Sequence, residues 1–362
     1  MLSLSPSTAA GYLAGTPFAG HTRITPLSGG VANVVLKCTD PATGHSIVLK
    51  QPLPVFKTAE EWRVDIDRAK VEHEAALLLA TLLPPGSVPE VLFFDERNYV
   101  LGLAAAPEEA LLWKTALLAG HTSIDAATHA GTLLALLHSH TLDDPALLAR
   151  YGPPAFFMQQ RTEPYLLHCA RRHPRLAPVL EALASRLLTT QRCLIHGDFS
   201  PKNIFLVPHP LAHGEPAVHR RPLSHLLLLD FEVAFYSHPA FDVATLINHL
   251  LLKAALRRHT HGDLAGPYFE MIEAFWQTYR YTAAPEVVRL ASAHGGQVLG
   301  ALLLARVDGK SPAEYLAPHP ALQAALRGAA TDILSSPGTA VEPTVAYLGS
   351  IFGTTIPIIS DG

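Results

Sequence analysis

Hydrophobic and polar residues alternate in short runs through the first hundred residues of the chain. Runs of this kind, bounded by Gly, Pro, Asn and Asp, are typical of β-strands. We expect strands at 24–27, 34–37, 46–50, 91–95 and 98–103. A longer pattern predicts a helix from Asp65 to Leu83, which Pro84-Pro85-Gly86 ends. A shorter helix is expected at 7–15, with Ser7 or Thr8 as its cap.

The pattern changes after Ala104-Ala105-Ala106-Pro107, where the strands stop. Apolar residues then recur with the spacing of amphipathic helices. We expect helices at 108–119, 124–140, 164–172, 176–189, 239–257, 265–281, 285–306 and 318–335. The residues from Ser336 onward have no helical period. This order predicts an α+β fold with two lobes: a small lobe of antiparallel strands plus one helix over 1–103, a mainly helical lobe over 104–335, and a tail over 336–362.

Composition narrows the class of protein. Of the 362 residues, 49% are apolar and 16% are charged, so the chain is expected to be globular. A net charge of −4 argues against a nucleic-acid partner. We find no leader sequence, no long charge run and no stretch of 18 or more residues apolar enough to span a bilayer. We therefore expect a cytoplasmic protein without a membrane partner, as a monomer or homodimer. Its three cysteines, Cys38, Cys169 and Cys193, suggest neither disulfides nor a zinc site.

The residues that carry chemistry lie in Ile195-His196-Gly197-Asp198-Phe199-Ser200-Pro201-Lys202-Asn203-Ile204, a polar loop between two apolar runs. A second segment follows, in which the apolar run Leu226–Leu229 ends in Asp230-Phe231-Glu232. An Asp base that precedes a metal-binding Asn by five residues, with a later metal-binding Asp, is the spacing of the kinase catalytic loop. We assign Asp198 as the base, and Asn203, Asp230 and Glu232 as oxygen ligands for Mg²⁺.

This loop resembles that of the aminoglycoside phosphotransferase and choline kinase superfamily of small-molecule kinases. The Asp-x-Glu form, followed by Val-Ala-Phe-Tyr and Pro239-Ala240-Phe241-Asp242, is most similar to methylthioribose kinases. So are the stretches 62–69 and 112–120. The resemblance implies a bilobal protein-kinase-like fold with ATP and Mg²⁺ as cofactors. The chain has Asn203 where methylthioribose kinases carry Ser, so the resemblance indicates the reaction type and leaves the substrate open.

A nucleotide site is expected in the first lobe. The turn with Gly29, Gly30 and Asn33 would let backbone N–H groups approach the phosphates, although a plain β-turn has the same pattern. Lys50 ends an apolar strand, as a phosphate-binding lysine does. The helix that follows carries Glu72 and Glu74 on different faces. We choose Glu74 as the partner of Lys50, because it lies in the apolar stripe of Val71, Leu78 and Leu82 and Arg68 can pair with Glu72.

Other residues have supporting roles. Backbone groups of Leu101 and Leu103, near the junction of the lobes, would meet the adenine. His196 supports the loop, and Asp242 either caps a helix or braces the loop; we favour bracing, as the superfamily implies. Arg306 either ends its helix or faces the substrate, as arginines near this point do in methylthioribose kinases. The histidine-rich loop over 208–222 is expected to be a solvated insertion without metal.

Together these features predict a kinase that transfers the γ-phosphate of ATP to a hydroxyl of a small metabolite. A sugar such as methylthioribose ranks first. Aminoglycosides rank lower, because the C-terminal half has no dense carboxylate cluster for a polycation. Amino alcohols such as choline, and homoserine-like substrates, stay open. A pseudokinase scaffold commonly lacks one of Lys50, Asp198, Asn203 and Asp230, and all four are present here.

Overall fold

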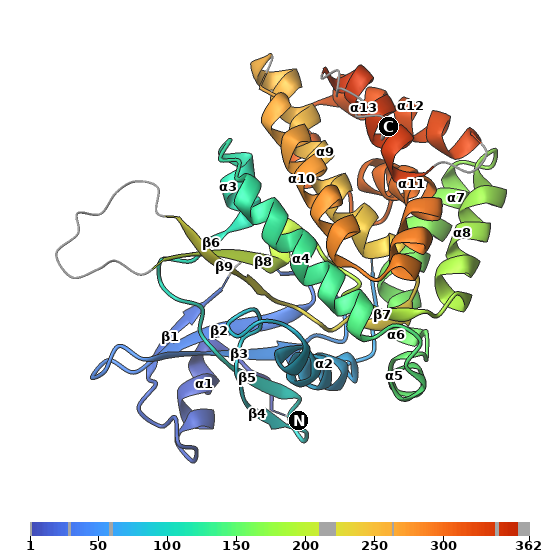
Figure 1. Cartoon of the computed structure of the whole chain (residues 1–362). Helices are drawn as coiled ribbons and strands as arrows, with labels where there is room; N and C mark the ends of the chain where they lie inside the picture. The colour runs from blue at the N-terminus through green and yellow to red at the C-terminus, as the bar shows by residue number, and fades with distance from the viewer. Residues whose placement is uncertain are drawn as a thin grey trace.

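A computed structural model describes residues 2–27, 30–57, 61–209, 222–262, 264–336 and 340–353. The expected α+β fold with two lobes is confirmed: a five-stranded antiparallel sheet with two helices forms the first lobe, and a mainly helical lobe follows (Figure 1). The strands of the first lobe are β1 (Arg23–Pro26), β2 (Asn33–Thr39), β3 (Ser46–Pro52), β4 (Val91–Asp95) and β5 (Val100–Ala104), in the spatial order β1-β2-β3-β5-β4. Its helices are α1 (Pro6–Leu13) and α2 (Arg68–Leu82).

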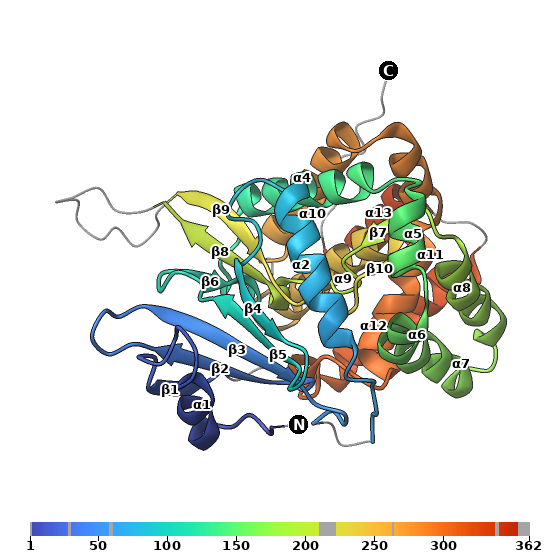
Figure 2. The same ribbon diagram turned by 90° about the horizontal axis from the view of Figure 1, so that it is seen from below.

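The alternation along β3 decides what each face of this sheet meets. Ile47 and Leu49 are fully buried with Ala9 and Leu13 of α1 in one apolar cluster. Lys50 points to the opposite face, since successive side chains of a strand alternate. That face meets α2, which stands between the sheet and the helical lobe (Figure 2). The ammonium group of Lys50 is thus directed at the cleft between the lobes rather than at α1.

The second lobe contains two small sheets. Strands β6 (Leu111–Leu112), β8 (Ile204–Pro208) and β9 (Leu223–Leu228) pair in the order β6-β8-β9, and β7 (Cys193–Ile195) pairs with β10 (Phe235–Ser237). The predicted catalytic loop, residues 196–203, connects β7 to β8. The segment that contains Asp230, residues 229–234, connects β9 to β10. Because β8 pairs with β9 and β7 pairs with β10, both loops run between the same two small sheets, which places them side by side.

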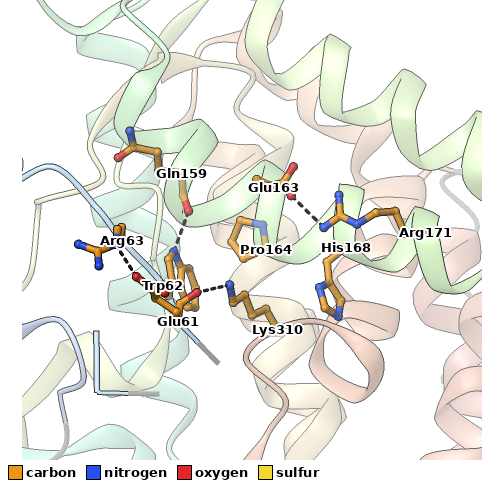
Figure 3. A pocket seen from close by; sticks show the side chains of 9 residues that line it. All are labelled: Glu61, Trp62, Arg63, Gln159, Glu163, Pro164, His168, Arg171 and Lys310. Carbon is orange, nitrogen blue, oxygen red and sulfur yellow. Dashed lines mark hydrogen bonds and ion pairs between the residues drawn. The ribbon is translucent and has the colours of Figure 1, made fainter. Parts of the chain in front are cut away.

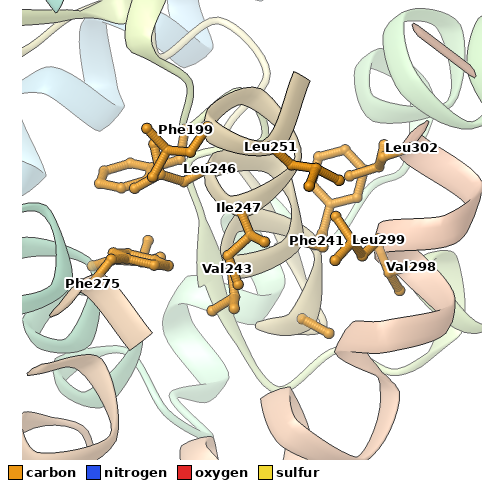
Figure 4. Packing of buried hydrophobic residues seen from close by; sticks show 14 of the residues in the cluster. Phe199, Phe241, Val243, Leu246, Ile247, Leu251, Phe275, Val298, Leu299 and Leu302 are labelled. Atoms are coloured by element: carbon orange, nitrogen blue, oxygen red, sulfur yellow. The ribbon is translucent and has the colours of Figure 1, made fainter. Parts of the chain in front are cut away.

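Helices make up the rest of this lobe. They are α3 (Trp113–Leu118), α4 (Ile124–His140), α5 (Pro145–Tyr151), α6 (Ala155–Phe157), the π-helix η1 (Met158–Leu167), α7 (His168–Arg172), α8 (Ala177–Thr189), the 3₁₀ turn η2 (Pro201–Asn203), α9 (Ala240–His261), α10 (Gly266–Thr282), α11 (Pro285–Asp308), the 3₁₀ turn η3 (Glu314–Leu316), α12 (Pro320–Ser335) and α13 (Val341–Phe352). Helix α9 is buried on almost every side over its first sixteen residues. Figure 4 shows Phe199 of the catalytic loop packed beside Leu246 of this helix, so the loop rests directly on the core.

Three expectations need correction. Residues 341–352 form α13, whose buried Val341, Leu348 and Phe352 pack on α11, so this part of the predicted tail is a docked helix. Helix α11 has the length and hydropathy of a membrane span, yet 67% of its apolar window is buried, because it is the core helix between α9, α12 and α13. Residues 111–112 form a strand, and the helix predicted at 108–119 is only α3.

Candidate active site

The loop between β7 and η2 is held from below by Asp242. The backbone N–H groups of His196 and Gly197 donate to its two carboxylate oxygens, at 2.6 and 3.0 Å. Asp242 is fully buried in the first turn of α9 and also lies 3.4 Å from His138 Nε2. Of the two roles open to Asp242, the structure places it against the loop, where its carboxylate orients two consecutive peptide groups.

The ring of His196 joins this loop to the segment that carries Asp230. Its Nδ1 accepts from the N–H of Asp198 at 3.2 Å, and its Nε2 lies 3.1 Å from the carbonyl of Leu229. Burial lowers the pKa of His196, so the imidazole is neutral and can accept at one nitrogen while it donates at the other. His196 therefore sets the spacing between Asp198 and Asp230.

Gly197 has a conformation that the loop requires. Its φ is +75°, a region that residues with a Cβ adopt only with strain. A Cβ at this position would lie 2.3 Å from the carbonyl oxygen of Val233. The glycine of the His-Gly-Asp motif is thus explained by close backbone contact with the neighbouring loop.

Asp198 is buried and lies between two cations. Arg161 Nη2 is 3.0 Å and Lys202 Nζ 2.8 Å from its Oδ2 atom. Burial would raise the pKa of Asp198, but Lys202 and Arg161 outweigh it and hold the pKa well below its ordinary value. The carboxylate is therefore ionised at any pH at which the protein would work, and both of its cations accompany it.

Lys50 reaches across the cleft to Asp230. Its Nζ lies 2.6 Å from Asp230 Oδ1 and 2.7 Å from Glu72 Oε1. Asp230 has φ +68°, which orients its side chain back toward the first lobe. Lys50 and Lys202 outweigh burial and hold the pKa of Asp230 below its ordinary value. The structure thus brings Lys50, Asp230 and the catalytic loop into one cleft.

The predicted pairing of Lys50 with Glu74 is wrong. Glu74 is partly exposed and binds Arg150 Nε at 2.8 Å, whereas Glu72 is 3% exposed and meets Lys50. The buried face of α2 is formed by Arg68, Glu72 and small residues such as Ala75 and Ala76. The stripe of larger residues was misleading, because Val71 and Leu78 pack against the core of the helical lobe, in which Leu79 is buried. Position in that stripe therefore does not bring Glu74 to Lys50.

Glu232 lies across the cleft from the first lobe and is held by it. Its Oε2 accepts from Asn33 Nδ2 at 3.0 Å and from Arg68 Nε at 3.2 Å. Lys50 Nζ is 3.9 Å from the same oxygen. Asn33, predicted to contact the nucleotide, therefore links the turn before β2 to the Asp-x-Glu segment.

Three carboxylates offer a site for a hard cation. Oxygen atoms of Glu72, Asp230 and Glu232 all lie within 4.8 Å of one another. Burial raises the pKa of Glu72 to about 7. Lys50 opposes this rise, and the negative charges of Asp230 and Glu232 contribute to it. Carboxylate oxygens suit Mg²⁺, so the donor set fits the expected ion. Asn203 is adjacent, since its carbonyl accepts from the N–H of Leu229, and its Nδ2 donates to the carbonyl of Asp198 at 3.0 Å.

Other predicted nucleotide contacts are placed differently. Leu101 and Leu103 lie in β5 with β3 paired on one side and β4 on the other, so their backbone groups face strand neighbours. The N–H groups of Ala104 and Ala105 also have partners, the carbonyls of Glu90 and Ser46, and the expectation for the two leucines is corrected accordingly. Gly30 lies before β2, whereas Gly29 and residues 210–221 of the histidine-rich loop lie outside the described residues.

Arg306 closes the turn after α11. Its Nη1 donates to the carbonyl of Ser311 at 2.5 Å, and its own carbonyl accepts from the N–H of Ala313. Its Nε atom is buried without a hydrogen-bond partner among the described residues. The structure thus places Arg306 in its alternative role at the helix end, and a contact with substrate stays a prediction.

A cavity of about 290 Å³ lies between the segment around Trp62, the π-helix η1 and Lys310 (Figure 3). Trp62 forms one wall, with its Nε1 donating to the carbonyl of Gln159, and Lys310 crosses its ring. The cavity is lined by Glu61, Trp62, Arg63, Gln159, Glu163, Pro164, His168, Arg171 and Lys310. Arg161, from the same π-helix as Gln159, contacts Asp198 and the carbonyl of Gly197 instead. The cavity is therefore separate from the phosphoryl-transfer residues.

Sequence reasoning missed Arg161 and Arg68. Arg161 lies in η1, which contains Pro164 and was expected to begin as a helix only at residue 164. A π-helical turn has no simple sequence signal, although such turns are frequent at functional sites. Arg68 was assigned to Glu72 as a neighbour on the same helix, but it binds Glu232 instead. The burial of Arg68 and its contact with Glu232 are decided by tertiary packing, so residue spacing carried no signal for this pair.

The amino-acid sequence is similar to those of known proteins. The sequence profile of the phosphotransferase enzyme family matches residues 23–214. A methylthioribose kinase of Yersinia pseudotuberculosis is 27% identical over 289 residues, which cover 69% of this chain and 65% of that protein. A methylthioribose kinase of Pectobacterium atrosepticum is 28% identical over 257 residues, or 62% and 58% of the two chains. The chain thus spans less than two thirds of these relatives.

Solved structures show a more distant likeness. Plasmodium vivax ethanolamine kinase matches with a TM-score of 0.49 and 14% identity, covering 96% of this chain and 85% of that chain. A choline/ethanolamine kinase family protein from Mesorhizobium loti matches with a TM-score of 0.45 and 17% identity, covering 96% and 98%. Both TM-scores are below 0.5.

Proposed function

The chain belongs to the phosphotransferase enzyme family, and on that premise we propose that it is a kinase that transfers the γ-phosphate of ATP to a hydroxyl of a small metabolite. One observation carries the proposal: Lys50 Nζ of the first lobe lies 2.6 Å from Asp230 Oδ1 of the second. The ring of His196 connects Asp198 to Leu229, the residue before Asp230. Groups for phosphate, metal and proton are thus collected in one cleft.

Each group has a distinct task. Lys50 carries its charge into the cleft, because Asp230 and Glu72 outweigh burial and raise its pKa above the ordinary value. It would contact the α- and β-phosphates. Asp230 and Glu232, with Asn203 beside them, would hold Mg²⁺, which neutralises charge on the phosphates when it is bound. Transfer then depends mainly on position and charge, since phosphoryl transfer asks little covalent chemistry of the protein.

Asp198 would receive the proton. The acceptor oxygen forms a bond to the γ-phosphorus, the bond to the bridging oxygen of ADP breaks, and the hydroxyl proton passes to Asp198. The low pKa of Asp198 keeps it ionised but makes it a weak base. Because the proton leaves late in such transfers, orientation of the hydroxyl is the main contribution. Arg161 and the backbone bonds to Asp242 hold the carboxylate and its loop in place.

The surroundings of Asp198 favour a neutral or acidic acceptor over a cationic one. Within the described residues, the charged side chains in contact with Asp198 are Arg161 and Lys202, both basic. Burial, followed by the charges of Lys253, Arg306 and Lys202, lowers the pKa of the partly buried His249, so further basic groups lie near this region. A polycationic aminoglycoside or a choline-like amine would be repelled. A sugar of the methylthioribose type is the first candidate, since relatives with 27–28% identity are methylthioribose kinases.

The direct test is ADP release with ATP and Mg²⁺ over a panel of acceptors. Methylthioribose and other sugars, amino alcohols, and aminoglycosides form its three arms. We expect turnover with a sugar and a product heavier by one phosphoryl group in mass spectrometry. Turnover confined to amines would overturn the substrate class, and nucleotide binding without turnover of any acceptor would favour the scaffold alternative.

A further inference from the structure

Arg68 is a buried side chain whose hydrogen-bonding capacity is fully used. It is 0% exposed, and all five of its N–H groups have an acceptor within reach. Its Nε donates to Glu232 Oε2 at 3.2 Å. Its Nη2 donates to the carbonyls of Ala32 and Leu53 at 2.7 and 3.0 Å, and its Nη1 to those of Val64 and Asp65 at 3.4 and 3.0 Å.

These acceptors belong to both sides of the cleft. Ala32 lies in the turn between β1 and β2, and Leu53 directly follows β3, so Nη2 binds the end of the hairpin expected to cover the phosphates. Leu53 N–H donates in turn to the carbonyl of Ala32 at 2.8 Å. Glu232, in contrast, follows β9 in the second lobe. A single guanidinium therefore connects the hairpin to the Asp-x-Glu segment.

The connection uses only one side of the Glu232 carboxylate. Asn33, next to Ala32 in the hairpin, donates to the same Oε2 atom that Arg68 binds. In the part of the chain that the structure describes, the hydrogen bonds to this carboxylate end on Oε2, which leaves Oε1 for another ligand. An oxygen of Glu232 also lies within 4.8 Å of oxygens of Glu72 and Asp230.

We propose that Arg68 is a positioning residue that ties Glu232 to residues 30–36, so that a metal ion bound at Glu232 also orders this part of the β1–β2 hairpin. This inference rests on the proposed function, because it assumes a metal-nucleotide site in the cleft. Metal binding and the order of residues 30–36 are then linked, and each must favour the other by the same factor.

The rigid part of this link is the guanidinium itself. Its planar fork fixes the direction of each donor, and a lysine would keep the charge but bind one or two acceptors instead of five. With Arg68→Lys, Glu232 and the hairpin could move independently. A merely structural arginine would behave differently, because its loss would loosen the hairpin to the same extent with and without metal.

Hydrogen–deuterium exchange of the full chain separates these cases. The protein is measured with ADP alone and with ADP plus MgCl₂, and exchange is compared for peptides covering 30–36 and 196–203. In the unmodified protein we expect Mg²⁺ to slow exchange in the hairpin by about tenfold, a common size for coupling between sites. In Arg68→Lys this metal-dependent slowing should fall below about twofold, which is less than the roughly fivefold lower end of typical coupling, while the slowing at 196–203 persists.

A matched control and two milder variants complete the design. Arg150→Lys is the matched control. Arg150 pairs with Glu74 on the exposed face of α2, the helix that also carries Arg68, and the Arg150→Lys protein should behave like the unmodified protein. If Arg68→Lys does not fold, Asn33→Ala and Asn33→Asp test the same link from its other donor, because Asn33 binds the Oε2 atom that Arg68 binds and is not one of the proposed metal ligands. Calorimetric titration of Mg²⁺ into each ADP complex should show a loss of affinity by the factor lost in hairpin protection.

The outcomes are distinct. Hairpin protection by Mg²⁺ that survives unchanged in Arg68→Lys, or in both milder variants, overturns the inference and leaves the proposed function intact. Faster exchange to an equal degree with and without Mg²⁺ also overturns it, since the role is then structural. Failure of the unmodified protein to bind ADP, with or without Mg²⁺, overturns the proposed function and this inference together.

Discussion

Lys50 and Asp230 are separated by 180 positions in the sequence, yet Lys50 Nζ lies 2.6 Å from Asp230 Oδ1. The pair joins the last part of β3 to the loop after β9, and so connects the two lobes. In this geometry the group that we propose for phosphate binding faces the group that we propose for metal binding. A nucleotide and its metal would enter between them and replace this direct contact.

Replacement of Asp198 by Asn tests the base. Asp198→Asn keeps the size of the side chain and removes its charge and basicity. We expect kcat to fall by about 10²–10⁴-fold, as for loss of a general base, with ATP affinity little changed. Steady-state kinetics with an identified acceptor beside a nucleotide titration checks this. Loss of ATP binding together with kcat would mean that Asp198 serves the fold or the metal instead.

Replacement of Asp230 by Asn tests the metal site. Asn tolerates the positive φ of this position better than Ala does, so the loop conformation should persist. We expect turnover to fall by more than about 100-fold, because even indirect supports of a metal site are worth 10–100-fold. Turnover is measured over a range of MgCl₂ concentrations, and circular dichroism reports the fold. Near-normal activity at every concentration would remove Asp230 from the site.

Glu72 and Glu74 form a matched pair on α2. Glu72→Gln weakens the buried contact with Lys50, and we expect kcat/KM for ATP to fall by about 10–100-fold, as for a hydrogen bond between charged groups. Glu74→Gln breaks an exposed ion pair with Arg150 and should change it by no more than about twofold. Equal effects of the two variants would contradict the orientation of α2, in which Glu72 faces Lys50 and Glu74 faces Arg150.

Arg161 is expected to orient the catalytic loop. It holds Asp198 with Nη2 and the carbonyl of Gly197 with Nε, at 3.0 and 2.6 Å. Arg161→Gln should lower kcat by about 10–100-fold, the worth of a charged hydrogen bond, and leave the KM for ATP unchanged. Arg171→Gln, on the exposed side next to Glu163, is the control. A rise in the KM for ATP in place of the kcat loss would show that Arg161 acts on the nucleotide.

Lys253 should make stability depend on pH. Burial, with Lys114 and Arg306 nearby, lowers the pKa of Lys253 to about 7 in the folded protein. In the unfolded chain a lysine keeps a pKa of about 10.4. Between these values the unfolded state binds more protons, so stability rises with pH through this window, by at most about 1.4 kcal/mol per pH unit.

The matching variant is Lys253→Met, which keeps the length of the side chain and removes its proton. We expect urea unfolding at about pH 7 and about pH 9 to show a rise in the free energy of unfolding for the unmodified protein relative to this variant. The comparison cancels other groups that titrate in the same range, such as the buried cysteines. A difference between the two proteins that does not change with pH would show that Lys253 stays charged inside the fold.

Sequence reasoning succeeded where a function is encoded by a short spacing. Asp198 and Asn203 lie in one loop, and Asp242 follows Asp230 along the next elements, so local order alone placed them near one another. The helix at Ile124–His140 was predicted at its observed bounds, because Ser123 accepts from the N–H of Ala126 as a helix cap and the apolar period is regular. In both cases the information lies within a few turns of the chain.

The contacts of Arg68, Glu72 and Arg161 required the tertiary structure. Helix α2 buries Ala75, Ala76 and Leu79 in the core of the helical lobe. Its Arg68 and Glu72 meet Glu232 and Lys50, an orientation that the apolar spacing of the helix does not reveal. Arg161 depends on a π-helical turn whose phase differs from that of an α-helix. The sequence by itself determined the order of the elements, the family and the residues of the two motif segments, because these follow from local spacing. Only the packing of the lobes decided which charges meet across the cleft, because the partners of a buried charge are chosen by burial and distance in space.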